Sequence, residues 1–287
     1  MKISAVILIL FLSFSCVNAQ EEIVTTFGEG VPVATVSDTD LDEISGLACS
    51  RNMPGMMYVH NDSGGEASIY LLDSLGKTLG KIELLNTVNR DWEDIAVGPG
   101  SDGKSYIYVG EIGDNTAAYD EIVIYRVPEP ATFSTISKIE PQKTTLTYPG
   151  GARDAESLMV DPISGDIFII SKRDSANTLY RLPAGKFGAA DAQLEEMIKL
   201  PLTSAVAADI SVDGRQILVK NYFSVYYWNR KNGETIAQAM SKVPTQLPYA
   251  PEPQGEAIGF SPSGKAYFTL SEKRFDIVPV LYKYSAK

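Results

Sequence analysis

Three glutamates and a serine recur at one repeated position of the chain, and together they could bind a divalent cation. The position, here called the slot, opens five short apolar segments and is filled by Ser45, Glu93, Glu156, Val206 and Glu256. If the five slots converge, their carboxylates must be neutralised by protons or by a cation. Ca²⁺ takes about six to eight oxygen ligands in a flexible geometry, which suits oxygens contributed by separate elements. The pattern predicts Ca²⁺ bound by Ser45, Glu93, Glu156 and Glu256.

Other acidic residues near the slots could add further ligands. Asp209 follows Val206 by three residues, and Glu43 and Asp94 flank two other slots. Asp209 could replace the missing slot ligand only if its strand bulges, whereas Glu43 and Asp94 could as easily accept hydrogen bonds from loop amides. The slot glutamates have the same alternative, in which they bond to backbone amides between repeats and bind no metal. A zinc site is not expected, because His60 is the only histidine and no ligand spacing fits zinc.

The intervals between slots predict the elements that must position these side chains. The steps are 48, 63, 50 and 50 residues, and repeats of this length built from short strands are typical of a β-propeller. Each slot strand is followed by a glycine turn and further β-branched or aromatic segments, which gives four strands per repeat. An insertion around residues 129–143 accounts for the longest step.

The last repeat has only three strand-like segments before the chain ends. Residues 23–36 are strand-like, precede the first slot and can supply the missing strand, which removes an exposed sheet edge. We therefore expect an all-β, five-bladed β-propeller with four antiparallel strands per blade, closed by the N-terminal strand.

This topology places the candidate functional residues on one face. In a blade the first strand lines the channel and the second returns antiparallel, so the slots lie beside the ends of the second strands. We call this side the blade-head face and expect it to be the functional one. The second-strand ends that it gathers are residues 60–62, 111–115, 172–173, 220–222 and 272–274.

Composition and the N-terminus restrict location and partners. Residues 1–19 are typical of a signal peptide, with cleavage before Gln20, and lipidation of Cys16 is the alternative. Either way we expect an exported protein, periplasmic or secreted, with residues 20–287 forming one propeller domain. No later segment has the length and hydropathy of a membrane span. A formal net charge of −11 argues against nucleic acid and anionic membranes as partners.

Two classes of function fit these features. As an enzyme, the chain would be a Ca²⁺-dependent hydrolase of phosphoesters or phosphoanhydrides, with Asp62 or Asp114 as general base and Lys172, Arg173 and Lys220 holding phosphate. As a binding or scaffold module, it would use Ca²⁺ to join the blades and would bind an extracellular anionic small molecule, glycan or protein. The second hypothesis is favoured, because no residue pair has a spacing that demands catalysis.

An aromatic run in the fourth repeat could contribute to such a binding surface. It consists of Tyr222, Tyr226, Tyr227 and Trp228. Strand alternation predicts that at least half of these side chains pack in the core.

The slot residues resemble those of the five-bladed calcium-activated nucleotidase (apyrase) family. The resemblance implies a central Ca²⁺ held by Ser45, Glu93, Glu156 and Glu256, although that family has a serine where this chain has Val206. The sequences of several segments are also similar to those of uncharacterised secreted bacterial propellers. This resemblance implies a fold and a location but no activity. Those segments are ISGLA (44–48), VHNDSG (59–64), DWEDIA (91–96), EIGDN (111–115) and IYRVPEP (124–130).

Overall fold

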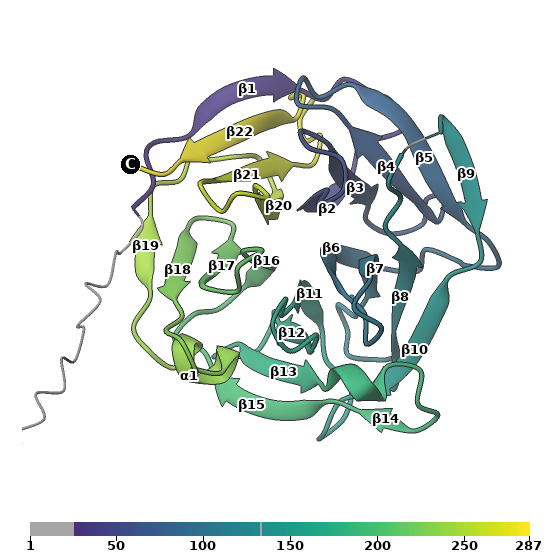
Figure 1. Cartoon of the computed structure of the whole chain (residues 1–287), viewed down its shortest axis with the longest axis vertical. Coiled ribbons are helices and arrows are strands. Elements are labelled where there is room, and N and C mark those ends of the chain that lie inside the picture. Colours follow the sequence, from purple (N-terminus) through teal and green to yellow (C-terminus); the bar gives the residue numbers. More distant parts are fainter. Residues whose placement is uncertain (1–25, 133) are drawn as a thin grey trace, which may run out of the picture.

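The computed structural model describes residues 26–132 and 134–287, and these form five β-sheets arranged in a ring (Figure 1). The expected five-bladed, all-β propeller is therefore confirmed. The predicted signal peptide and Cys16 lie outside the described residues. The described part of the chain contains no helix that is long and apolar enough to cross a membrane.

Each blade is built on an antiparallel meander of four strands. The first blade contains β2 (Ile44–Cys49), β3 (Met57–Asn61), β4 (Ser68–Leu72) and β5 (Thr78–Leu84). The second contains β6 (Trp92–Pro99), β7 (Ser105–Glu111), β8 (Ile122–Pro128) and β10 (Gln142–Thr147). The third contains β11 (Ala155–Val160), β12 (Ile167–Ser171), β13 (Thr178–Leu182) and β15 (Glu195–Lys199). The fourth contains β16 (Ala205–Ile210), β17 (Gln216–Asn221), β18 (Val225–Asn229) and β19 (Thr245–Leu247).

The fifth blade joins the two ends of the chain, as the sequence predicted. Its strands are β20 (Gly255–Phe260), β21 (Ala266–Ser271), β22 (Val280–Ser285) and β1 (Val31–Thr35). β1 pairs antiparallel with β22, so that Val31 lies opposite Lys283. Ahead of β1, Phe27 is buried and its ring lies edge-on to Tyr267 at 5.0 Å.

Two blades carry a fifth strand that the sequence analysis did not predict. β9 (Ile136–Ile139) lies within the expected insertion and pairs in parallel with β5 of the preceding blade. β14 (Ala192–Gln193) likewise pairs in parallel with β10 of the preceding blade. In both cases a segment from one blade covers the outer edge of the blade before it, which leaves fewer unpaired backbone groups. Short helical segments, η1 (Ala184–Lys186) and α1 (Ile236–Met240), complete the outer layer.

The first strands of neighbouring blades pack closely around the axis (Figure 1). This approach requires a glycine at one contact between the fifth and first blades. A Cβ at Gly259 would lie 2.8 Å from the backbone oxygen of Leu47 and 2.7 Å from its Cδ2. The inner strands thus form a packed centre, and the polar groups of the site lie at their ends.

Candidate functional site

Every slot residue is the extra residue of a β-bulge in the first strand of its blade. The pairing of β2 with β3 passes from Ile44 to Gly46 and omits Ser45. The same omission occurs at the other four slots, which are Glu93, Glu156, Val206 and Glu256. A bulge takes one residue out of the ladder and redirects its side chain. All five side chains are buried, with residue exposures between 0% and 5%.

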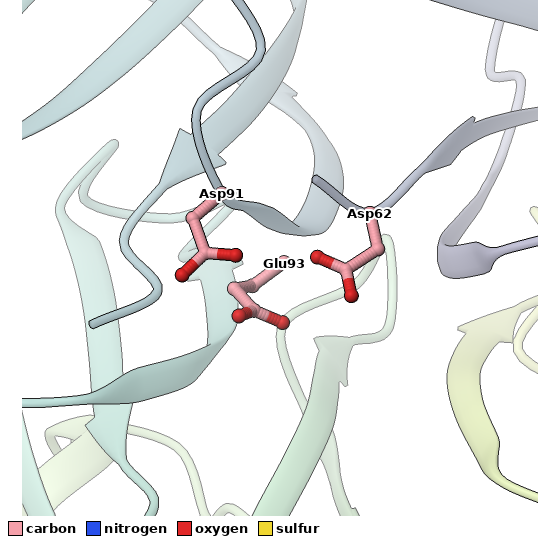
Figure 2. Close-up of side chains that lie close together, drawn as sticks. All are labelled: Asp62, Asp91 and Glu93. Atoms are coloured by element: carbon pink, nitrogen blue, oxygen red, sulfur yellow. The ribbon is translucent and has the colours of Figure 1, made fainter. Parts of the chain in front are cut away.

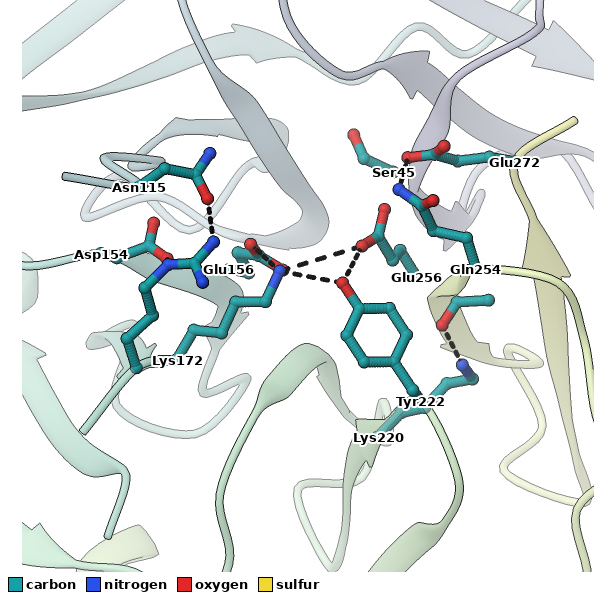
Figure 3. A network of polar contacts seen from close by, with 12 residues as sticks. Ser45, Asn115, Asp154, Glu156, Lys172, Lys220, Tyr222, Gln254, Glu256 and Glu272 are labelled. Carbon is teal, nitrogen blue, oxygen red and sulfur yellow. Dashed lines mark hydrogen bonds and ion pairs between the residues drawn. The ribbon is translucent and has the colours of Figure 1, made fainter. Parts of the chain in front are cut away.

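Lys172 lies between two of the slot glutamates and balances their charge (Figure 3). Its ammonium pairs with Glu156, lies 3.9 Å from Glu256 Oε1 and donates to the Tyr222 hydroxyl at 3.0 Å. Tyr222 in turn donates to Glu256 Oε1 at 2.5 Å. Burial alone would lower the pKa of Lys172, but Glu156 and Tyr222 outweigh it and raise that pKa. The protein therefore supplies its own cation to these two glutamates. They lie at the opening of the central channel on the blade-head face, here called the mouth.

A second charged pair continues the network toward the second blade. The Arg173 guanidinium lies 2.6 Å from Asp154 Oδ2 and also contacts the side chain of Asn115. The other oxygen of Asp154 accepts a hydrogen bond from the backbone amide of Asp114 at 2.9 Å. Glu93, Asp154 and Glu156 offer oxygens within 4.8 Å of one another, and two of these three carboxylates have a cationic partner.

Asp62, Asp91 and Glu93 form the third group, and their carboxylates point toward one another (Figure 2). Each offers an oxygen within 4.8 Å of the other two. Burial, together with Asp91, Glu256 and Glu43, raises the pKa of Asp62 to about 7. The pKa of Glu93 is raised well above its ordinary value by burial and then by Glu156 and Asp62. This group, here called the acidic triad, has no lysine or arginine ion pair among the described residues.

The four predicted Ca²⁺ ligands do not form a free shell around the axis. Glu156 and Glu256 already share Lys172, and the Ser45 hydroxyl donates to the backbone oxygen of Trp92 at 2.9 Å. Only Glu93 of the four is without such a partner among the described residues. A central Ca²⁺ of the kind that the nucleotidase resemblance implies would have to displace an ammonium group, so these residues fit it poorly.

The additional ligand candidates lie in different places. Asp94 accepts hydrogen bonds from the backbone amides of Ile95, Leu158 and Ala208, which joins three blades. Asp209 accepts the amides of Ile210 and Phe260 and, with Arg51 and Cys49, lines a small pocket away from the mouth. Glu43 is exposed, and its backbone oxygen accepts the amide of Asp62. Asp94 thus makes the backbone contacts that were its alternative to metal binding, and Asp209 is held by backbone amides as well.

Several catalytic candidates are held in structural contacts. The carboxylate of Asp114 accepts the backbone amides of Ala118 and Tyr119 at 2.8 and 2.7 Å. Lys220 is fully buried, donates to the backbone oxygen of Gly255 and lies 3.9 Å from Glu252. Burial lowers the pKa of Lys220 to about 8, with Glu252 opposing the shift. Asp62 is half-buried, and the side chain of Arg173 is 52% exposed.

His60 is held in structural contacts. Its Nδ1 lies 2.9 Å from the backbone oxygen of Asn61, and its ring meets that of Trp92 edge-on at 5.7 Å. Burial lowers the pKa of His60 to about 4, so the ring is neutral at pH 7.

Asp91 and Asp154 were missed, although the sequence contained a signal for them. Each stands two residues before a slot glutamate, in the pattern Asp-x-Glu (91–93 and 154–156). The residue at this position lies in the connection that enters the blade on the same face, so it joins the slot at the mouth. Aligning the repeats two residues further upstream would have found both.

Exposed aromatic side chains surround this charged mouth. Phe223, Phe275 and Tyr119 are 86%, 90% and 45% exposed, and each lies in a connection between the second and third strands of a blade. In the predicted aromatic run, Tyr227 and Trp228 are buried, which confirms that half of it is core. Phe275 and the following Asp276 have φ angles of +53° and +59°, an unusual backbone conformation for non-glycine residues.

No protein-family model matches the sequence, and a search of curated proteins finds no match. Solved structures with a similar arrangement include a nidogen/laminin complex, with 14% identity and a TM-score of 0.46 over 79% of this chain and 72% of that one. Another is the hydrazine synthase of Kuenenia stuttgartiensis, with 11% identity and a TM-score of 0.43 over 85% and 96% of the two chains. Identities this low say nothing about ligand or activity.

Proposed function

We propose that this protein is an exported binding module whose blade-head face takes an acidic glycan, with Ca²⁺ supporting the charged mouth. The observation that carries the proposal is the set of exposed aromatic rings around buried charges. Phe223 and Phe275 are almost fully exposed although each stands beside charged or polar network residues. Exposed aromatic side chains that gather at one end of a rigid scaffold are typical of interaction sites.

The chemistry of the face favours a ligand with both apolar faces and negative charge. Aromatic rings offer flat apolar surfaces on which sugar rings can lie, and Arg173 offers a guanidinium that can hold a carboxylate or sulfate. The positive φ angles of Phe275 and Asp276 support the same interpretation, because strained backbone concentrates at functional sites.

Binding to a panel of neutral and acidic oligosaccharides tests the proposal, with calorimetry on the purified protein. We expect Phe223→Ala and Phe275→Ala each to weaken binding about tenfold or more, since interface aromatics are frequent hot spots. Val243→Ala is the matched control, because Val243 is 92% exposed and lies in a connection at the opposite face. Equal affinity in all three variants, or no binding to any acidic glycan, would refute the proposal.

The hydrolase hypothesis keeps one supporting observation. The half-buried Asp62 and the exposed Arg173 lie on the same face, as a base and an anion-binding group would have to do. Nucleotides, phosphate esters and lactones, tested with and without Ca²⁺ on wild type and Asp62→Asn, decide this alternative. Turnover that needs Ca²⁺ and disappears in Asp62→Asn would favour catalysis over binding.

A further inference from the structure

We propose that the protein binds one Ca²⁺ off the propeller axis, at Asp62, Asp91 and Glu93, while Lys172 takes the place of a metal at the axis. The inference deepens the proposed function, because it gives the supporting Ca²⁺ a position. It departs from the shell that the slot pattern predicted, since two of the three ligands are not slot residues.

The first argument is the contrast between the two groups of carboxylates at the mouth. Glu93, Asp154 and Glu156 lie close together, but Lys172 and Arg173 pair with two of them. The acidic triad is equally compact and has no such pair among the residues that the structure describes. Arg90, which directly precedes Asp91, lies over the ring of Tyr119 and 4.0 Å from Glu111. It makes no ion pair with the triad and acts on Asp91 only through its charge.

The second argument is the state of Glu93 itself. Its residue exposure is 5%, and among the described residues no side chain or amide makes a hydrogen bond or ion pair with its carboxylate, on which Lys172 acts only through its charge. The β-bulge at this slot directs that side chain into the triad, where Asp62 and Asp91 face it (Figure 2). Asp62 adds a buried Oδ1 without a hydrogen-bond partner. A buried, unpartnered carboxylate is costly, and a cation would supply the missing partner.

The third argument concerns the kind of cation. All donors are hard oxygen atoms on two segments, the end of β3 and the stretch that enters β6. Such flexible oxygen sets suit Ca²⁺, with water completing its shell, better than the near-octahedral Mg²⁺. Gly113 fits the arrangement, since a Cβ there would lie 2.5 Å from the Asp91 carboxylate. Glycine therefore leaves the space that the triad requires.

Titration with Tb³⁺ in place of Ca²⁺ gives a direct readout. Trp92 stands between Asp91 and Glu93 in sequence, and the chain has only one other tryptophan, Trp228 in the fourth blade. Excitation of Trp92 should sensitise Tb³⁺ emission in the triad. We expect one emitting site in wild type and displacement of Tb³⁺ by added Ca²⁺, with calorimetry giving the Ca²⁺ affinity independently.

The variants separate the two positions. Asp91→Asn removes the charge of one triad ligand and should weaken Ca²⁺ binding about tenfold or more, because Ca²⁺ affinity follows the number of charged ligands. Glu256→Gln changes a slot residue outside the triad whose charge also acts on Asp62, so it should change Ca²⁺ affinity several-fold less than Asp91→Asn does. The exposed control Asp102→Asn at the other face should leave Ca²⁺ affinity within about twofold. Circular dichroism at 25 °C confirms that each variant is folded.

Three results would overturn the inference: no Ca²⁺ binding by wild type, loss of binding in Glu256→Gln but not in Asp91→Asn, or equal binding in all variants. None of these results decides whether the blade-head face binds an acidic glycan, which is measured separately in excess EDTA and in Ca²⁺.

Discussion

At the scale of single residues, the charge balance of the mouth depends on Lys172. Its side chain is 10% exposed and its partner Glu156 is 4% exposed, so removing the ammonium leaves buried carboxylates without a cation. We expect Lys172→Met to lower the free energy of unfolding by about 3–5 kcal/mol at pH 8, as for other broken buried pairs. Urea denaturation measures the change.

Lys273→Met is the control for this experiment, because Lys273 is exposed and lies two residues beyond the end of β21, the second strand of its blade as β12 is of its own. A surface substitution of this kind should change stability by less than about 0.5 kcal/mol. Equal effects of the two substitutions would contradict the role given to Lys172.

The pH dependence of stability follows from the raised carboxyl groups. Burial with neighbouring acids raises the pKa of Asp62 to about 7, and burial with Glu256 raises that of Glu272 to about 9. The folded protein therefore binds more protons at these two carboxyl groups than the unfolded chain does. Their contribution to the free energy of unfolding is fully present below about pH 4 and is lost as the pH rises through 7 to 9. In EDTA, the melting temperature should fall by several degrees between pH 5 and pH 9, at about 2–4 °C per kcal/mol.

Asp62→Asn should flatten that fall between pH 5 and pH 8, because the amide does not titrate. A wild-type melting temperature that rises over the same interval would contradict the assignment.

The sequence identified part of the site and missed the rest for a definable reason. The slots were found because five repeats share them, and the shared bulge explains why Val206 could keep the slot backbone without keeping an oxygen. That Lys172 lies on the blade-head face also followed from topology. Its direction toward Glu156 and Glu256 depends on side-chain packing between blades, which no local pattern encodes.

At the scale of elements, β1 and the segment before it close the ring. Phe27 is 2% exposed and packs against aromatic rings of two blades, Tyr227 at 6.0 Å and Tyr267 at 5.0 Å. We expect Phe27→Ala to cost about 3–5 kcal/mol of stability, the usual range for a buried phenylalanine. Differential scanning calorimetry measures it, with Val31→Ala as control because Val31 is 57% exposed. A change no larger than in the control would mean that this segment does not hold the ring together.

The edge strands β9 and β14 show where element prediction stops. Four strands per blade could be predicted because each follows the last through a short connection. β9 pairs in parallel with β5, from which β6, β7 and β8 separate it in the chain. β9 pairs with β5 because β5 presents an open sheet edge close to it in space. The short sequence of β9 carries no signal that identifies this partner.

At the scale of the whole molecule, the packing of inner strands sets how close the blades can come. Gly259 lies against the backbone of Leu47 in the neighbouring blade, and a backbone atom cannot move aside as a flexible side chain can. Gly259→Ala should therefore destabilise the protein by more than about 2 kcal/mol through overpacking. Gly185→Ala is the control, since nothing lies within 4 Å of a Cβ at that position. Thermal melting of both variants tests this interpretation, and an equal change in melting temperature in the two variants would contradict it.

The closure of the fifth blade also determines when the molecule can become complete. Because Val31 pairs with Lys283, the ladder of that blade spans nearly the whole sequence. Its formation requires the loss of more chain entropy than any other pairing in the fold, and contacts of such sequence separation slow folding. A chain emerging from its N-terminus can form the first four blades in turn, but β1 must wait unpaired until the last strand is available. The final step of folding is thus the joining of the first and last strands, and until then β1 is an open edge that a chaperone or a second chain could meet.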